Sequence, residues 1–313
     1  MVKSPLLWVG FNALVLVMLA LDLVVFNRKA HPISIKEATV WSVIWVVLAL
    51  AFNLLIYLWF GRAPALEFLT AYLIERSLSF DNIFVFVIIF AYFNIPAKYQ
   101  HRVLFWGILG AVVMRAVLIA TGMALISAFH WVIYVFGAFL IYTGFKLALQ
   151  KGETVRPATN PVVRLIHQHI PFTETLSGQR FFTRVDGRLL ATPLLLVLMV
   201  IETSDLIFAV DSIPAIFGVT HDPFLIYTSN VFAILGLRAF YFLLAGVVNL
   251  FRYLKVGLGF ILSFVGLKML AADILPVRTD FSLAFILLVL VVSILASILI
   301  RAPESDAGSS GGR

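Results

Sequence analysis

The sequence has no cysteine and few charged residues. Of its 313 residues, 62% are apolar and 12% are charged, whereas soluble domains are roughly 45–50% apolar and about 25% charged. The absence of cysteine excludes disulfides, thiolate metal sites, iron–sulfur clusters and cysteine nucleophiles. Any chemistry must therefore use carboxylates, amides, imidazoles and hydroxyls. The composition is that of a protein whose solvent is the lipid bilayer.

Nine apolar stretches are long enough to cross a bilayer, whose hydrocarbon core of about 30 Å takes about 20 helical residues. They predict an all-α, polytopic membrane protein. The expected spans are residues 6–26, 38–60, 64–93, 103–128, 131–149, 190–218, 224–247, 254–272 and 281–300. No small-residue cleavage site follows the first span, so we expect it to be retained as an anchor.

The net charge of +7 does not indicate nucleic-acid binding, because the basic residues fall mainly between the apolar stretches. The gaps after spans one, three, five and seven and the C-terminus hold most of them, and the opposite side holds only Lys3, Arg62 and Arg278. This asymmetry predicts an N-terminus outside and a C-terminus in the cytoplasm. Residues 150–189 then form a cytoplasmic loop, and we expect the tail at 301–313 to be disordered.

A repeat is visible in the middle of the chain. Spans three to five resemble spans six to eight at an offset of 122 to 124 positions. The matching residues are Asp81–Phe84 with Asp205–Phe208, Arg115-Ala116 with Arg238-Ala239, and Gly137, Gly144 and Lys146 with Gly259, Gly266 and Lys268. Because each unit contains three spans, the second copy must be inverted in the membrane. Inverted repeats are typical of transporters, which bind their substrate near the midplane.

The predicted organisation follows from the spans and the repeat. Two N-terminal spans (1–60) precede the first three-helix unit (61–149). The cytoplasmic loop (150–189), the second and inverted unit (190–272), the last span (273–300) and the tail (301–313) complete the chain. The sequence does not indicate an oligomeric state.

Spans three and six carry acidic residues deep in the membrane: Glu75, Asp81, Glu202, Asp205 and Asp211. Each costs about 2.5–3.5 kcal/mol at a helix centre if it faces lipid, so we expect these acids to face one another, a cation or water. Within each span, two acids six positions apart differ by about 9 Å in height and about 120° in direction. Either the backbone unwinds locally, for which Pro214 offers a cause, or the acids mark successive stations along a path.

The candidate ligands are all oxygen donors. With Asn82 and Asn230 added, the five carboxylates suit Mg²⁺, Ca²⁺ or Mn²⁺, whereas Zn²⁺ and Cu²⁺ favour imidazole or thiolate. We expect Arg115 and Arg238 to balance charge. Because protons compete with a metal for clustered carboxylates, the hypothesis is metal–proton exchange across the lipid bilayer, with no bound cofactor and no enzymatic reaction.

Other interpretations stay open at this point. Glu75 beside Arg76 can be a structural salt bridge. Two aspartates from different spans could form an intramembrane hydrolase, or the chain could be a non-transporting assembly or stress factor. His167 and His169 could hold a transition metal, but a solvated loop is the favoured interpretation.

Three segments carry a family resemblance: Tyr72–Asn82, Ile201–Phe217 and Asn230–Ala239. They resemble the TerC family of integral membrane proteins, and the chain is similar over residues 5–300 to its Alx branch. The resemblance implies manganese efflux across the bacterial cytoplasmic (inner) membrane. By motif match, it also implies that Glu75, Asp81, Glu202, Asp205 and Asp211 handle the metal.

Overall fold

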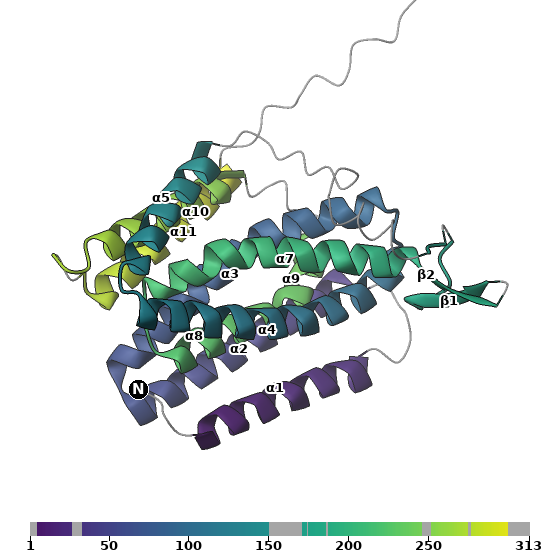
Figure 1. Ribbon diagram of the computed structural model, residues 1–313, viewed down its shortest axis with the longest axis horizontal. Coiled ribbons are helices and arrows are strands. Elements are labelled where there is room, and N and C mark those ends of the chain that lie inside the picture. The colour runs from purple at the N-terminus through teal and green to yellow at the C-terminus, as the bar shows by residue number, and fades with distance from the viewer. Residues whose placement is uncertain are drawn as a thin grey trace, which may run out of the picture.

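The computed structural model describes residues 5–26, 33–149, 171–173, 175–185, 187–245, 252–274 and 277–299, and most of them are helical (Figure 1). The helices are α1 (Pro5–Phe26), α2 (Ile35–Phe60), α3 (Arg62–Tyr92), α4 (Ala97–Ala128), α5 (Val132–Leu149), α7 (Pro193–Phe217), α8 (Pro223–Leu235), α9 (Leu237–Leu244), α10 (Arg252–Leu270) and α11 (Thr279–Leu299). Strands β1 (Phe182–Val185) and β2 (Arg188–Ala191) form an antiparallel hairpin.

The helices occupy the ranges in which spans were expected, with α8 and α9 sharing one range. Seven helical stretches are long and apolar enough to cross a membrane, which confirms a mostly helical, polytopic protein. Helix α3 is not among the seven, because its charged residues are spread along its length. These are Arg62, Glu67, Glu75, Arg76 and Asp81. That all nine ranges cross the bilayer stays a prediction.

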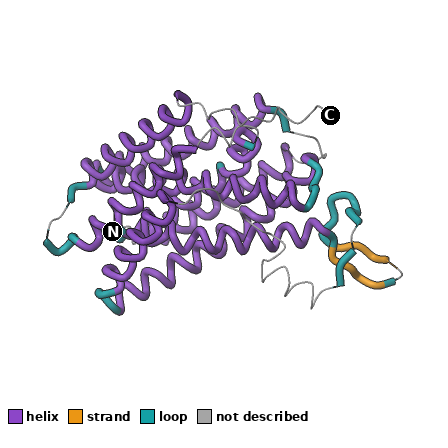
Figure 2. The backbone as a smooth tube through the Cα atoms, turned by 90° about the horizontal axis from the view of Figure 1, so that it is seen from above, coloured by secondary structure: helices purple, strands orange, loops and turns teal. Residues whose placement is uncertain are grey.

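The β-hairpin was not expected from the sequence. Span six was predicted to begin at residue 190, but Arg188–Ala191 forms β2, and α7 begins at Pro193. The hairpin projects from one end of the helical bundle (Figure 2). Proline has no backbone N–H to donate and is favoured in the first turn of a helix, so Pro193 marks the true start of α7.

The start of α2 and its junction with α3 follow from local sequence. Ser34 caps α2 by accepting a hydrogen bond from the backbone N–H of Glu37 at 3.2 Å, an arrangement typical of a Ser-x-x-Glu start. Gly61 alone separates α2 from α3 and has a φ of 89°. Glycine adopts this conformation readily, so the chain reverses at one residue and α3 packs against α2.

Helices α5 and α10 are in backbone contact through glycines. A Cβ atom at Gly144 would lie 2.6 Å from the carbonyl oxygen of Gly259, and one at Gly259 would lie 2.5 Å from that of Gly144. Gly137 and Gly266 form the corresponding reciprocal pair, at 3.0 and 2.5 Å. Helix α3 also packs against α8, and α7 packs against α4.

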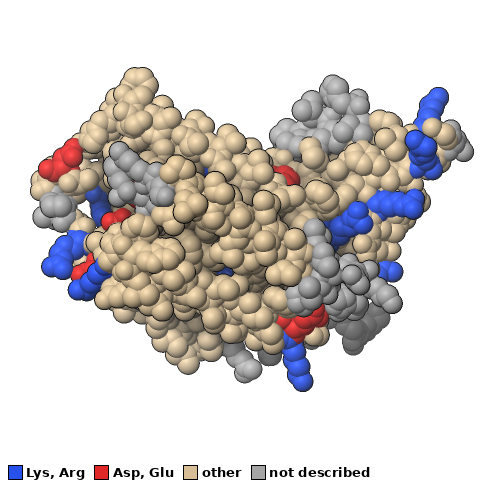
Figure 3. Space-filling view, turned by 90° about the horizontal axis from the view of Figure 1, so that it is seen from below, with Lys and Arg blue, Asp and Glu red and all other residues tan. Residues whose placement is uncertain are grey.

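The outer surface is largely apolar. Lysine, arginine, aspartate and glutamate lie mainly toward the two ends of the molecule on the face shown in Figure 3, with a broad region that has few charged residues between them. Leu288, Val292 and Ile298 on α11 are 62%, 55% and 64% exposed. Such a surface fits lipid contact. The buried polar residues described next are therefore the exception within this fold.

Candidate metal site

The site lies where α3 and α7 pack together. Asp205 stands near the middle of α7, and Glu75 stands near the middle of α3. Both are buried, with exposures of 3% and 1%. At about 1.5 Å per residue, each lies roughly 20 Å from the first residue of its helix. In a bilayer-spanning arrangement that depth corresponds to the hydrocarbon core.

Arg115 of α4 joins the two acids. Its guanidinium donates to Asp205 through Nε at 3.3 Å and Nη2 at 3.2 Å, and Nη1 donates to Glu75 Oε1. Nη1 also reaches Ser212 Oγ at 3.3 Å and Asn230 Oδ1 at 2.8 Å. A planar guanidinium with five N–H donors suits such a set of acceptors. The predicted charge-balancing role of Arg115 agrees with this geometry.

The two predicted asparagines complete this network. Asn82 Nδ2 donates to Asp205 Oδ1 at 2.9 Å, which joins α3 to α7 directly. Asn230 Nδ2 lies 3.4 Å from Glu75 Oε2. Each amide nitrogen thus satisfies a carboxylate oxygen in a region where an unpaired polar group is costly.

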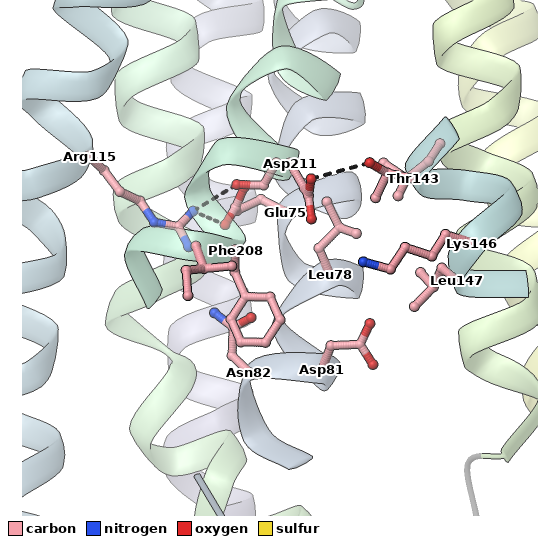
Figure 4. A pocket seen from close by; sticks show the side chains of 13 residues that line it. Glu75, Leu78, Asp81, Asn82, Arg115, Thr143, Lys146, Leu147, Phe208 and Asp211 are labelled. Atoms are coloured by element: carbon pink, nitrogen blue, oxygen red, sulfur yellow. Dashed lines mark hydrogen bonds and ion pairs between the residues drawn. The ribbon is translucent and has the colours of Figure 1, made fainter. Parts of the chain in front are cut away.

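A cavity of about 210 Å³ opens beside this network, and we call it the carboxylate cavity. Its polar lining comes from Glu75, Asp81, Asn82, Arg115, Thr143, Lys146, Asp211 and Ser212. Figure 4 shows Arg115 on one side of the space and Thr143 and Lys146 on the other. Helices α3, α4, α5, α7 and α10 all contribute to the wall.

Asp211 and Asp81 contact other residues than Glu75 and Asp205 do. The hydroxyl of Thr143 donates to Asp211 at 3.4 Å, and Lys255 Nζ lies 3.9 Å from Asp81 Oδ1. The two aspartates therefore line the cavity without a bidentate arginine. Their oxygens are better placed to bind an incoming cation than those of Asp205.

Helix α7 is continuous through both of its aspartates. Pro214 lies in the last turn, and the helix ends at Phe217, so the backbone does not unwind between Asp205 and Asp211. Among the described residues, no three His, Asp or Glu side chains form a group that could hold a metal ion. The continuous helix does not show the local unwinding considered from the sequence, and the alternative of successive stations along a path stays a prediction.

Four predicted site residues do not line the carboxylate cavity: Asp205 and Asn230, which belong to the network beside it, and Glu202 and Arg238, which lie further away. Glu202 faces α4 beside Gly110, and its Oε2 has no hydrogen-bond partner in the described part of the chain. Arg238 Nη1 lies 3.4 Å from His101 Nε2, and both residues line a small space with Glu37. The cavity lining includes neither Glu202 nor Arg238.

Arg76 does not form the ion pair considered from the sequence. Its Nη1 donates to the backbone carbonyl of Ala233 at 3.2 Å, and its guanidinium lies 4.0 Å from the centre of the Phe240 ring. Arg76 thus stabilises the junction of α8 and α9 at Gly236. Glu75 is nevertheless ion-paired, to Arg115 from another helix.

A second cavity, of about 320 Å³, lies where α5 begins and α7 and α10 end. We call it the histidine pocket, and its polar side chains are His130, Tyr134, His221, Lys268, Asp273 and Thr279. The Tyr134 hydroxyl donates to Asp273, and His130 Nε2 lies 3.7 Å from the same carboxylate. Nothing in the sequence indicated this cavity.

Three cavity residues were missed from the sequence: Thr143, Ser212 and Lys146. The first two hydroxyls carry no pattern that separates them from other Ser and Thr residues in helices. Lys146 was noticed only as a repeat match to Lys268, which is a signal that could have pointed to it. His167 and His169 lie outside the described residues.

Known proteins resemble this chain over almost its full length. The model of the family described as "Integral membrane protein TerC family" matches residues 60–305. "Uncharacterized membrane protein STKORF319" of Myxococcus xanthus is 55% identical over 308 residues, which cover 98% of this chain and 97% of that protein. "Putative membrane-bound redox modulator Alx" of Escherichia coli K12 is 49% identical over 319 residues, covering 98% and 99%. No solved structure gives a significant match.

Proposed function

The chain belongs to the TerC family of integral membrane proteins, and from this premise we propose that it is a secondary transporter that exports Mn²⁺ through the carboxylate cavity. The observation that carries the proposal is the cavity itself. Acids from two helices border about 210 Å³ of open space at mid-helix depth. Ionisable residues at that depth are costly, and they commonly mark ion pathways.

The donors suit a hard divalent cation. Asp81 and Asp211 supply carboxylate oxygens from opposite helices, and Asn82, Thr143 and Ser212 supply neutral oxygens. Ions of this class retain water when a site offers few carboxylates. A partly hydrated ion is therefore consistent with a cavity in which no three acids converge.

Asp205 and Arg115 have a different role in this proposal. The bidentate contact occupies both oxygens of Asp205, so this pair holds α4 against α7 and fixes the wall of the cavity. Glu75 shares Arg115 but also lines the space. We propose Asp81 and Asp211 as the principal ligands, Glu75 and Asn82 as neighbours that the ion can reach, and Asn230 as a support for Glu75.

Transport requires access from both sides, and we propose that the inverted repeat provides it. The reciprocal contacts of Gly144 with Gly259 and of Gly137 with Gly266 are those that a two-fold relation between α5 and α10 requires. We take the N-terminus to be outside, as the distribution of basic residues predicts. In that orientation the histidine pocket faces outward, and the carboxylate cavity lies between it and the cytoplasm.

The proposed exchange partner is the proton. When a doubly charged ion leaves, the carboxylates repel one another in a medium of low dielectric, and proton uptake from the outside relieves that repulsion. A chain without cysteine has no thiol for redox chemistry. We therefore propose that any redox effect of the kind named for the E. coli relative follows from metal movement.

Flux in sealed vesicles tests the function. Purified protein in liposomes loaded with a metal-sensitive dye should move Mn²⁺ faster than Mg²⁺, Ca²⁺ or Zn²⁺, and a pH gradient across the membrane should accelerate the movement. The D81N/D211N double variant is the matched control, because amides keep the shape of the carboxylates. Equal Mn²⁺ flux in wild-type and double-variant vesicles would contradict the proposal.

A further inference from the structure

Two cations border the carboxylate cavity, and they are held in different ways. Arg115 is 2% exposed and donates to four side chains. Lys146 is exposed, and among the described residues no ion pair fixes its ammonium group. Arg115 is thus part of the protein framework, whereas Lys146 is free to change its position.

Lys146 is nevertheless directed at the acids. Figure 4 shows its side chain extending from α5 toward the space that Asp81 and Asp211 border. An electrostatic attraction links it to Asp211, while Thr143, one turn earlier on α5, donates to the same carboxylate. An ammonium group on a flexible four-carbon stem is a mobile point charge.

The repeat places a second lysine, Lys268, at the histidine pocket. Lys268 of α10 lines the histidine pocket and is attracted electrostatically to Glu67. Lys146 and Lys268 are the matching residues of the two repeat units. One lysine therefore stands at each cavity, on the two helices that touch through glycines.

We propose that Lys146 is a tethered counter-cation that competes with the transported metal ion for Asp81 and Asp211. The inference rests on the proposed function and adds a residue to it. When the cavity is free of metal, the ammonium group moves in and neutralises part of the carboxylate charge. When the metal ion enters, the ammonium group moves away from Asp81 and Asp211 toward the opening of the cavity. The empty carrier can then change its conformation with fewer uncompensated charges in the membrane.

Charge balance explains why such a cation is useful. Glu75, Asp81, Asp205 and Asp211 bring four negative charges to the cavity and its wall. Arg115, which pairs with Glu75 and Asp205, and Lys255, which lies beside Asp81, offset two of them. A divalent ion matches the remaining two. After its release, Lys146 compensates for one charge, so fewer protons are needed to neutralise the cavity.

Metal binding to the purified protein tests this inference. Titration of Mn²⁺ by calorimetry should show about tenfold tighter binding to K146M than to wild type, because a competing unit charge is removed. K146R, which keeps the charge, should bind Mn²⁺ with near wild-type affinity. K268M is the matched control, because it removes the repeat-related lysine from the other cavity, and its Mn²⁺ affinity should stay within twofold of wild type.

Chemical rescue separates competition from a structural effect. K146A leaves space for a small ammonium ion, so adding n-propylammonium should weaken Mn²⁺ binding to K146A back toward the wild-type value and leave wild type unchanged. Unchanged or weaker Mn²⁺ binding by both K146M and K146A would overturn the inference. Unchanged binding would show that the Lys146 side chain extends toward lipid headgroups and does not compete with the metal ion. Absence of Mn²⁺ binding and flux in the wild-type protein would instead overturn the proposed function.

Discussion

The two cavities lie along the same helices but differ in chemistry. The carboxylate cavity is bordered by Glu75, Asp81 and Asp211, with Arg115 held rigidly at its wall. The histidine pocket has imidazoles, a phenol, a lysine and one acid, Asp273, which is 58% exposed in its side chain. Buried acids on one side and exposed mixed groups on the other indicate different tasks.

This difference indicates which cavity selects the ion and which cavity the ion only passes through. An acid deep in a membrane is expensive to keep ionised, so a cation that enters the carboxylate cavity is stabilised by acids that are already there. The acid of the histidine pocket is solvated and engaged by Tyr134 and His130, so a cation there gains little. In the proposed transporter, the first cavity selects the ion and the second is a vestibule through which it leaves.

The largest expected effect follows from removing the guanidinium. R115M leaves Glu75 and Asp205 buried without their cation, and breaking a buried ion pair in this way costs roughly 3–5 kcal/mol. We expect a large drop in the midpoint of thermal unfolding in detergent. K268M, the comparable change in the histidine pocket, should leave the midpoint almost unchanged. Similar midpoints for the two variants would contradict the proposed contrast between Arg115, which is held rigidly, and the mobile lysines at the two cavities.

Loss of one cavity acid should come next in size. D81N is expected to reduce Mn²⁺ flux at least about a hundredfold, roughly 2.7 kcal/mol, because an amide offers no negative charge to the ion. The protein should stay folded, as judged by its elution in size-exclusion chromatography. D273N provides the comparison from the histidine pocket and should keep flux within about twofold of wild type. Equal losses in D81N and D273N would show that the cavities do not differ in the way described.

Much of this fold could be read from the sequence. Hydropathy placed the helices to within a few residues in most cases, because a chain in lipid must satisfy its backbone hydrogen bonds within each helix. It did not reveal the hairpin at Phe182–Ala191, which is too short for a periodic signal, nor the break at Gly236 between α8 and α9. The break at Gly236 is accompanied by a tertiary contact, that of Arg76 with Ala233, which the local sequence does not reveal.

The site was predictable as a set of residues but not as an arrangement. Intramembrane charge alone identified Glu75, Asp81, Asp205, Asp211 and Arg115. Which acid Arg115 binds depends on how α4 packs against α3 and α7, and a single sequence does not contain that information. The same holds for Asp205 and Glu202, which lie outside the cavity lining although Asp211 of the same helix is part of it.

A smaller effect is expected at the contact of α5 and α10, two helices that contribute to the walls of both cavities. G144A would place a Cβ atom 2.6 Å from the Gly259 carbonyl oxygen, which is backbone and cannot turn away. We expect a loss of about 1–3 kcal/mol in unfolding experiments. In G218A the nearest atoms are side-chain atoms, Val265 Cγ1 at 2.5 Å and Met269 Cγ at 2.9 Å. These can adjust, so G218A should cost less, and the reverse order would contradict the close contact.

The smallest expected effect concerns His221, which lies between α7 and α8 at the histidine pocket. Burial lowers the pKa of His221 below its ordinary value of 6.5, Lys268 and His130 lower it further, and Glu67 partly offsets them. Because the pKa is lower in the folded state, the unfolded chain takes up the proton first as the pH falls. This contribution to the free energy of unfolding is therefore complete above about pH 6.5 and decreases below it. NMR titration of labelled histidine should show E67Q lowering the pKa of His221 and K268M raising it, and opposite shifts would contradict the proximity of these groups.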